Sequence, residues 1–220
     1  MKPALVVLVL SLNLACSFAL KAPPTAATAT RITASYGSSL MHFGEFDVKG
    51  IVEKSVGVGV VFSRGRAALE QRSVHFTVTR SGKPFAQLTC AAAPSEPKLK
   101  MGSLSLNHPK YTLECTGDDF TFAMTGDPEK PLAGVVTYRG VRYPVKTSAD
   151  TADKGSSPHL GFHVESDEGW LASADIQGPT WLSTRLSPES REAVVLANFA
   201  WASRRNVMLE GVDTGFMVKR

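Results

Sequence analysis

Apolar and polar residues alternate along much of the chain between residues 31 and 183. The clearest case is residues 73–80, where two valines and a phenylalanine alternate with histidine and threonine. A period of two places every second side chain on the same face, which is typical of a β-strand. Residues 56–60 show the same period, with valines separated by glycines. We therefore expect a succession of short strands.

Turn-forming pairs of residues separate these strands at short intervals. Four such pairs lie between strand-like segments: Ser81-Gly82, Gly117-Asp118, Arg139-Gly140 and Glu168-Gly169. Short glycine-containing turns are typical of β-hairpins. The same region has no convincing 3.6-residue period. The pattern favours a mainly β fold, an antiparallel hairpin-rich barrel or sandwich, over alternating strands and helices.

The C-terminal stretch differs and predicts one helix over about residues 187–205. Ser187 is a good N-cap, and Pro188 suits the first helical position. Residues 193–202 are apolar almost all the way round, so the helix should be buried on most sides. Because ten apolar residues are too few to cross a membrane, we expect the helix inside or against the sheet. The prediction is a single β-rich domain over residues 45–220.

A turn-like segment, Gly178-Pro179-Thr180-Trp181-Leu182, lies between the predicted hairpins and the apolar helix. This order of elements resembles the tubby C-terminal, LURP-one and phospholipid-scramblase-like group. The resemblance covers about residues 45–210 and implies a β-barrel wrapped around a hydrophobic C-terminal helix. It rests on element order, and it carries over no signature motif and no phosphoinositide-binding residue. The chain is also similar to small exported proteins of unknown role.

Residues 1–19 predict a signal peptide, because a basic start precedes an apolar run over residues 4–15. As a helix this run is about 18 Å long, short of the ~30 Å core of a bilayer. One interpretation makes Cys16 the lipid-modified first residue of a bacterial lipoprotein, since residues 12–16 resemble a lipobox apart from Asn13. Another places an ordinary cut after Ala19, which fits the small-residue rule.

A third interpretation is a bipartite import signal for a secondary plastid, with Phe18 at the start of a transit-like segment. Residues 21–44 favour it because they are rich in serine and threonine and have no acidic residue. We expect residues 20–44 to be a low-complexity tether or such a transit segment. All three interpretations export the protein: to the periplasm or outer envelope, into the medium, or into a plastid. Membrane attachment is expected only through a lipid on Cys16.

Two cysteines, Cys90 and Cys115, remain outside the signal region. In an exported protein an even number of remaining cysteines suggests a disulfide. Both cysteines lie in strand-like segments, so we expect a cross-strand bridge. Two buried free thiols are the alternative. The chain has no C-x-x-C pair and no cysteine–histidine cluster of the zinc type.

The search for catalytic motifs gives little. The formal net charge of +4 is mild and scattered, which disfavours a nucleic-acid partner. No nucleophile elbow, P-loop or H-E-x-x-H is present. His159 and His163 are four residues apart, which in a strand is about 13 Å and too far to share a metal ion. Acidic residues gather in turns, where carboxylates serve solvation and capping. We expect no enzyme, metal or cofactor.

The most suggestive surface surrounds the Arg139-Gly140 turn. It consists of Tyr138, Arg139, Arg142, Tyr143 and Lys146, a composition enriched at interfaces and suited to anionic partners. The alternative is an exposed hairpin whose charges serve only solubility.

From the whole sequence we expect a non-enzymatic binding or structural module at an envelope or organelle surface, with a protein or lipid partner. A carrier of a lipid or small apolar ligand, held beside the helix, is the second hypothesis.

Overall fold

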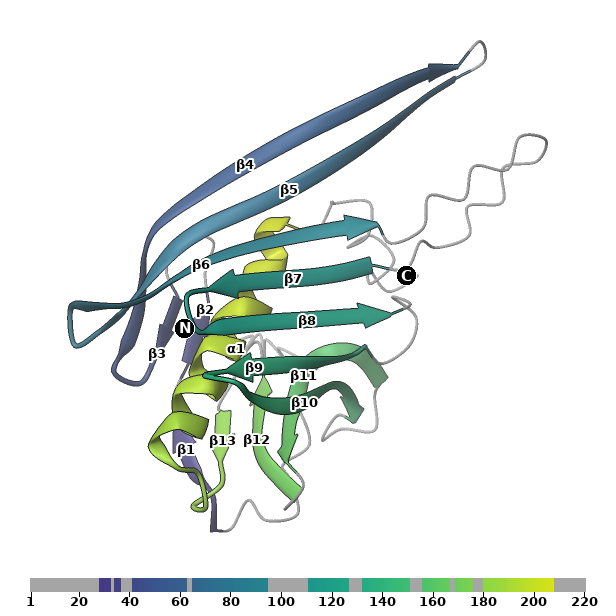
Figure 1. Ribbon diagram of the computed structural model, residues 1–220. Helices are drawn as coiled ribbons and strands as arrows, with labels where there is room; N and C mark the ends of the chain where they lie inside the picture. The colour runs from purple at the N-terminus through teal and green to yellow at the C-terminus, as the bar shows by residue number, and fades with distance from the viewer. Residues whose placement is uncertain are drawn as a thin grey trace, which may run out of the picture.

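The computed structural model describes residues 28–32, 34–36, 41–62, 65–94, 111–126, 132–150, 156–166, 169–175 and 180–207. These residues form thirteen strands and one helix (Figure 1). The elements are β1 (Thr30–Ile32), β2 (Ala34–Tyr36), β3 (Met41–Phe43), β4 (Phe46–Phe62), β5 (Gly65–Arg80), β6 (Lys83–Pro94), β7 (Tyr111–Gly117), β8 (Phe120–Gly126), β9 (Ala133–Tyr138), β10 (Val141–Asp150), β11 (Ser156–Ser166), β12 (Gly169–Asp175), β13 (Thr180–Leu182) and α1 (Pro188–Val207).

All thirteen strands belong to one antiparallel sheet. From β2 to β13 each strand pairs with the next in the chain, and β1 returns to pair with β13. The two edges, β1 and β2, are separated in sequence only by Thr33. If β1 and β2 are counted as one strand, the sheet has twelve strands and forms a nearly closed barrel. The predicted mainly β, hairpin-rich barrel with one C-terminal helix is therefore confirmed.

Two of the predicted hairpin turns have the backbone that a tight hairpin requires. Ser81 and Gly82 have φ angles of 49° and 80°, and Arg139 and Gly140 have 49° and 81°. Positive φ at both central positions is the signature of a type I′ turn, whose twist matches that of paired strands. Between β7 and β8 the turn residues are Asp118 and Asp119, one position later than expected.

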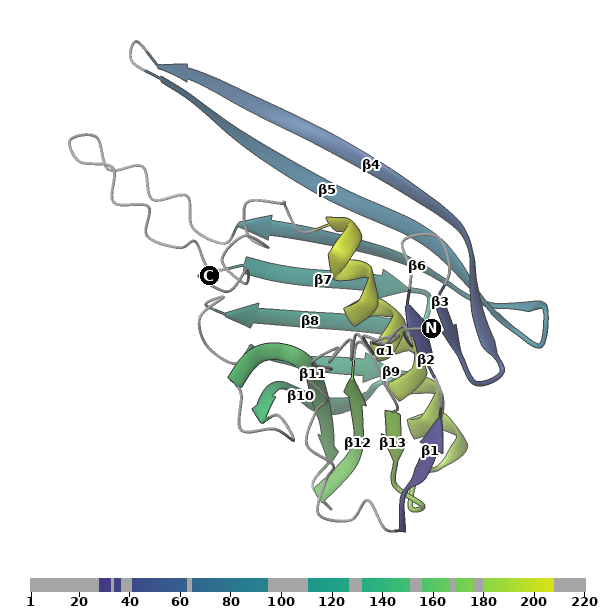
Figure 2. The ribbon, with the colours of Figure 1, turned by 180° about the vertical axis from the view of Figure 1, so that it is seen from behind.

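The helix α1 lies on the concave side of the sheet and forms the centre of the core (Figure 2). It starts at the predicted place, because the Ser187 hydroxyl accepts a hydrogen bond from the Ser190 amide at 3.1 Å. Every residue from 193 to 203 is buried, which agrees with the apolar pattern. Phe199 packs edge-on against Phe43 at 6.5 Å between ring centroids, and Trp201 packs against Phe162 at 6.0 Å. No helix among the described residues is long and apolar enough to span a membrane.

The folded part of the chain begins earlier than the boundary predicted at residue 45. Strands β1, β2 and β3 lie in the stretch assigned to a tether over residues 20–44, and Met41 and Phe43 are core residues. The error has a physical cause. These strands are only three residues long, which is too short for a clear alternating pattern, and β1 is held by pairing with β13, which is distant in sequence.

The strands β4 and β5 are much longer than the short strands expected for this region, with 17 and 16 residues. Their outer halves pair only with each other among the described strands, and they extend beyond the barrel as an arm (Figures 1 and 2). The register shifts between Lys49 and Val52, and Gly50 has a φ of 65°, so a bulge marks the base of the arm. We call residues 55–72 the β4–β5 arm.

Candidate functional site

The two cysteines lie directly opposite each other on β6 and β7. Their sulfur atoms are 2.05 Å apart, in agreement with the predicted cross-strand disulfide. Both residues are fully buried on the inner face of the barrel, where Cys115 Sγ lies 3.8 Å from the Ala200 carbonyl oxygen of α1. The bridge therefore belongs to the core beneath the helix and not to an exposed redox site.

The predicted surface around the Arg139-Gly140 turn does not exist as one patch. Tyr138 and Tyr143 are buried on the inner face, whereas Arg142 and Lys146 are exposed on the outer face. The reason is the two-residue period of a strand: on β10, residue 143 points inward while residues 142 and 146 point outward. The structure keeps Tyr138 and Arg139 together and separates them from the other two basic residues.

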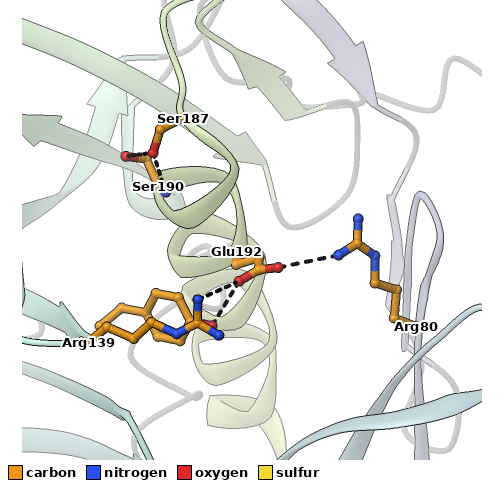
Figure 3. Close-up of polar contacts among 6 residues, drawn as sticks. Arg80, Arg139, Ser187, Ser190 and Glu192 are labelled. Atoms are coloured by element: carbon orange, nitrogen blue, oxygen red, sulfur yellow. Dashed lines mark hydrogen bonds and ion pairs between the residues drawn. The ribbon is translucent and has the colours of Figure 1, made fainter.

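A different group of side chains meets at the start of the helix. Glu192, in the second turn of α1, accepts a hydrogen bond from the Tyr138 hydroxyl at 2.9 Å and one from the Arg80 guanidinium at 3.3 Å. Arg139 forms a longer ion pair with the same carboxylate at 3.7 Å (Figure 3). Arg80 also contacts Glu45 at 2.9 Å. We call these five residues the Glu192 cluster.

Hairpin turns bring the cluster together at one rim of the barrel. Arg80 ends β5 immediately before its turn, and Arg139 is itself a turn residue between β9 and β10. Backbone hydrogen bonds connect neighbouring turns: the Ser81 amide donates to the Glu45 carbonyl at 3.0 Å, and the Arg139 amide donates to the Asp119 carbonyl at 2.9 Å. The four turns are therefore joined in two pairs, and Glu192 connects the pairs through Arg80 and Arg139.

Aromatic rings hold the two arginines in place. The Arg80 guanidinium lies 5.3 Å from the centre of the Phe46 ring, and that of Arg139 lies 5.0 Å from the centre of the Tyr138 ring. The Glu192 side chain is only 16% exposed, whereas those of Arg80 and Arg139 are 46% and 52% exposed. Because a guanidinium has five donors, both arginines keep donors that face solvent while Glu192 fixes their positions.

The hydroxyl of Tyr138 has its hydrogen-bond acceptor in Glu192. Burial, the hydrogen bond to Glu192 and the negative charge of that carboxylate together raise the pKa of Tyr138 to about 12. Tyr138 therefore remains a hydrogen-bond donor at physiological pH. A second link joins the helix to β10, because the Tyr143 hydroxyl lies 3.3 Å from Ser190 Oγ.

Two shallow pockets flank the Glu192 cluster. The larger, of about 250 Å³, is lined by Phe46 and Leu186 together with Arg80 and Arg191. The smaller, of about 130 Å³, is lined by apolar residues including Phe85, Phe120 and Leu196, and by Asp119 and Arg139. Ligand pockets for small molecules usually measure about 300–1,000 Å³, so these two are better matched to single side chains. Sequence reasoning missed this arrangement because its residues come from four separate turns and the helix.

One histidine of the outer face is part of a hydrogen-bond chain. His163 Nδ1 lies 2.6 Å from Ser173 Oγ, and Trp170 Nε1 donates to the same oxygen at 2.7 Å. Because the indole can only donate, Ser173 Oγ accepts from Trp170, and the same oxygen is shared with His163 Nδ1. Ser173 is fully buried, whereas His163 is partly exposed. The side chain of His159 lies outside the described part of the chain.

Comparison with known proteins gives no match to a protein-family model, a curated protein or a solved structure. The resemblance to the tubby-like group therefore stays a prediction. Among the described residues no group of three histidine, cysteine or carboxylate side chains is placed to hold a metal ion. The rim around Glu192 is the arrangement of exposed, pre-positioned side chains that we take as the candidate site.

Proposed function

We propose that this protein is an exported, non-enzymatic binding module that contacts a protein partner through the rim around the Glu192 cluster. The observation that carries the proposal is the fixing of two half-exposed arginines on aromatic rings and on one shared carboxylate. Side chains ordered before binding lose little entropy on binding. Arginines of this kind are enriched among the residues that dominate interface energetics.

The chemistry of the rim favours a protein partner over a nucleic acid. Acidic residues stand beside the basic ones, including Glu45 next to Arg80 and Asp119 next to Arg139. A mixed-sign surface with small apolar pockets suits a peptide segment that presents a carboxylate and an apolar side chain. A nucleic acid instead favours basic side chains of one sign along a groove.

The packing of the barrel interior supports this proposal over an apolar-ligand carrier. Inward side chains of the described strands pack against α1, with Phe43, Phe162, Phe199 and Trp201 among the contacts. An apolar ligand of about 300 Å³ or more would have to displace these side chains.

A displayed library of random peptides, selected on the chain that starts at Leu20, tests the proposal directly. Selected peptides should contain an acidic residue beside an apolar one, and their dissociation constants are measured by fluorescence anisotropy. Arg139→Ala and Arg80→Ala should each weaken binding about tenfold or more, the size expected when an important interface arginine is removed.

Lys146→Ala is the matched control, because Lys146 is an exposed cation on the outer face away from the rim. It should leave the dissociation constant unchanged. Selection of peptides that bind both arginine variants as tightly as the original chain would place the binding surface elsewhere. A failure to enrich any peptide would contradict the proposed module.

A further inference from the structure

The segment that holds β1 and β2 closes the barrel. On one side β1 pairs with β13 through Thr30↔Leu182, Arg31↔Trp181 and Ile32↔Thr180. On the other side β2 pairs with β3 through Ala34↔Phe43, Ser35↔His42 and Tyr36↔Met41. The same short stretch of chain therefore pairs with both sides of an otherwise open sheet. We call residues 30–36 the closing strap.

Losing the strap together with β3 would open the core. Met41 and Phe43 are buried, and Phe43 contributes the ring that packs against Phe199 of the helix. His42 Nδ1 lies 2.7 Å from the carboxylate of Asp47, so β3 also holds the start of β4. A chain that begins near residue 45 would expose one face of α1 and leave two unpaired strand edges, which favour aggregation.

This dependence bears on where the precursor is cut. A cut before Cys16 or after Ala19 keeps the strap, whereas a cut near residue 45, as in the third interpretation of the N-terminus, removes both the strap and β3. We propose that the mature protein begins between Cys16 and Thr30 and keeps residues 30–36 as the strap that closes the barrel. The inference rests on the proposed export of the protein.

The processing step is the hydrolysis of a single peptide bond. A signal-type peptidase adds one water molecule across the bond, so the leader gains a carboxylate and the mature chain gains a new amino group. No oxidant or other co-reactant is needed. A cut before Cys16 leaves fourteen residues in front of the strap, and a later cut leaves fewer.

Two recombinant chains, one starting at Leu20 and one at Glu45, test whether the strap is needed. The Leu20 chain should unfold in one cooperative thermal transition. The Glu45 chain should lack that transition and should bind the dye ANS, because its core is open. If the Glu45 chain melts at the same temperature and binds no dye, the inference is overturned, whatever the destination of the protein.

Point variants of the Leu20 chain supply a matched pair. Ile32 is partly buried and packs against the core, whereas Arg31 beside it is exposed. Ile32→Asp should lower the melting temperature by several degrees, and Arg31→Asp should leave it within about 2 °C, the usual range for surface changes. Equal effects of the two variants would contradict the role of the strap.

The intact mass of the mature protein from its producing cell tests the cut itself. A first residue between Cys16 and Thr30 supports the inference. A first residue after Thr30 overturns it while leaving export in place. A chain that keeps Met1 overturns both the cut and the proposed export, so the two failures are distinguishable.

Discussion

At the scale of single residues, Glu192 joins the helix to the barrel. Its carboxylate contacts Tyr138, Arg80 and Arg139, which come from two different hairpins. The alternation of residues along a strand could have shown that Tyr138 and Tyr143 point inward. No local pattern could have shown that they meet Glu192 and Ser190, because these contacts span 54 and 47 residues.

Glu192→Gln should lower the free energy of unfolding by about 1 kcal/mol. The amide keeps the shape of the side chain but loses the charge that attracts both arginines and the Tyr138 hydroxyl. The cost stays modest because both guanidiniums are half exposed and can be hydrated. Urea denaturation measures the effect, and Glu114→Gln, at an exposed strand position, is the control. If Glu192→Gln leaves the free energy of unfolding unchanged, the cluster adds nothing to stability.

Tyr138 should make stability fall at alkaline pH. Its pKa rises from 10.0 to about 12 on folding, so the folded state favours the protonated phenol. The corresponding stabilisation is complete below pH 10 and is lost as the pH rises through 12. Tyr138→Phe should remove this part of the pH dependence, as measured by urea denaturation across that range. Identical pH profiles for the two proteins would contradict the burial of the Tyr138 hydroxyl beside Glu192.

At the scale of elements, the helix and the tight hairpins could be predicted and the short N-terminal strands could not. Ser187, Pro188 and the apolar run encode α1 locally, and Arg139-Gly140 encodes its turn. Strand β1 is defined by its pairing with β13, about 150 residues away. The length of β4 was hidden by a bulge at Gly50, which interrupts the alternation at its base.

Val195→Asp should abolish cooperative folding. Val195 is fully buried at the middle of the apolar part of α1, and an unpaired carboxylate there costs several kcal/mol, comparable with the total stability of a small domain. Arg191→Asp, one turn earlier at an exposed position, should fold normally. Circular dichroism during heating distinguishes the two. A soluble Val195→Asp protein that melts cooperatively would show that the helix is not interior.

At the scale of the whole molecule, the barrel and the β4–β5 arm are separable. Apart from Arg72, which also pairs with Ala92 of β6, the arm pairs only with itself among the described strands. The barrel is held together by the helix, the disulfide and the closing strap. The sequence could predict a mainly β barrel or sandwich that buries the helix, since a helix that is apolar on most sides must pack against apolar side chains of other elements. It could not predict which strands meet to close the barrel.

Replacing residues 55–72 by Asn-Gly, so that the directly paired Lys54 and Ser73 are joined by a tight turn, should leave the barrel intact. The melting temperature should change by no more than about 4 °C, the shift that about 1 kcal/mol produces in a domain of this size. Differential scanning calorimetry measures it. Loss of the transition would show that the arm contributes to the core.

Hydrogen exchange of the α1 backbone tests the central claim, that a nearly closed sheet encloses this helix, most directly. Amides of residues 194–202 of the intact protein should exchange only through global unfolding, with the same free energy that denaturant unfolding gives. Exchange of these amides within seconds under native conditions, while the strands stay protected, would contradict the account.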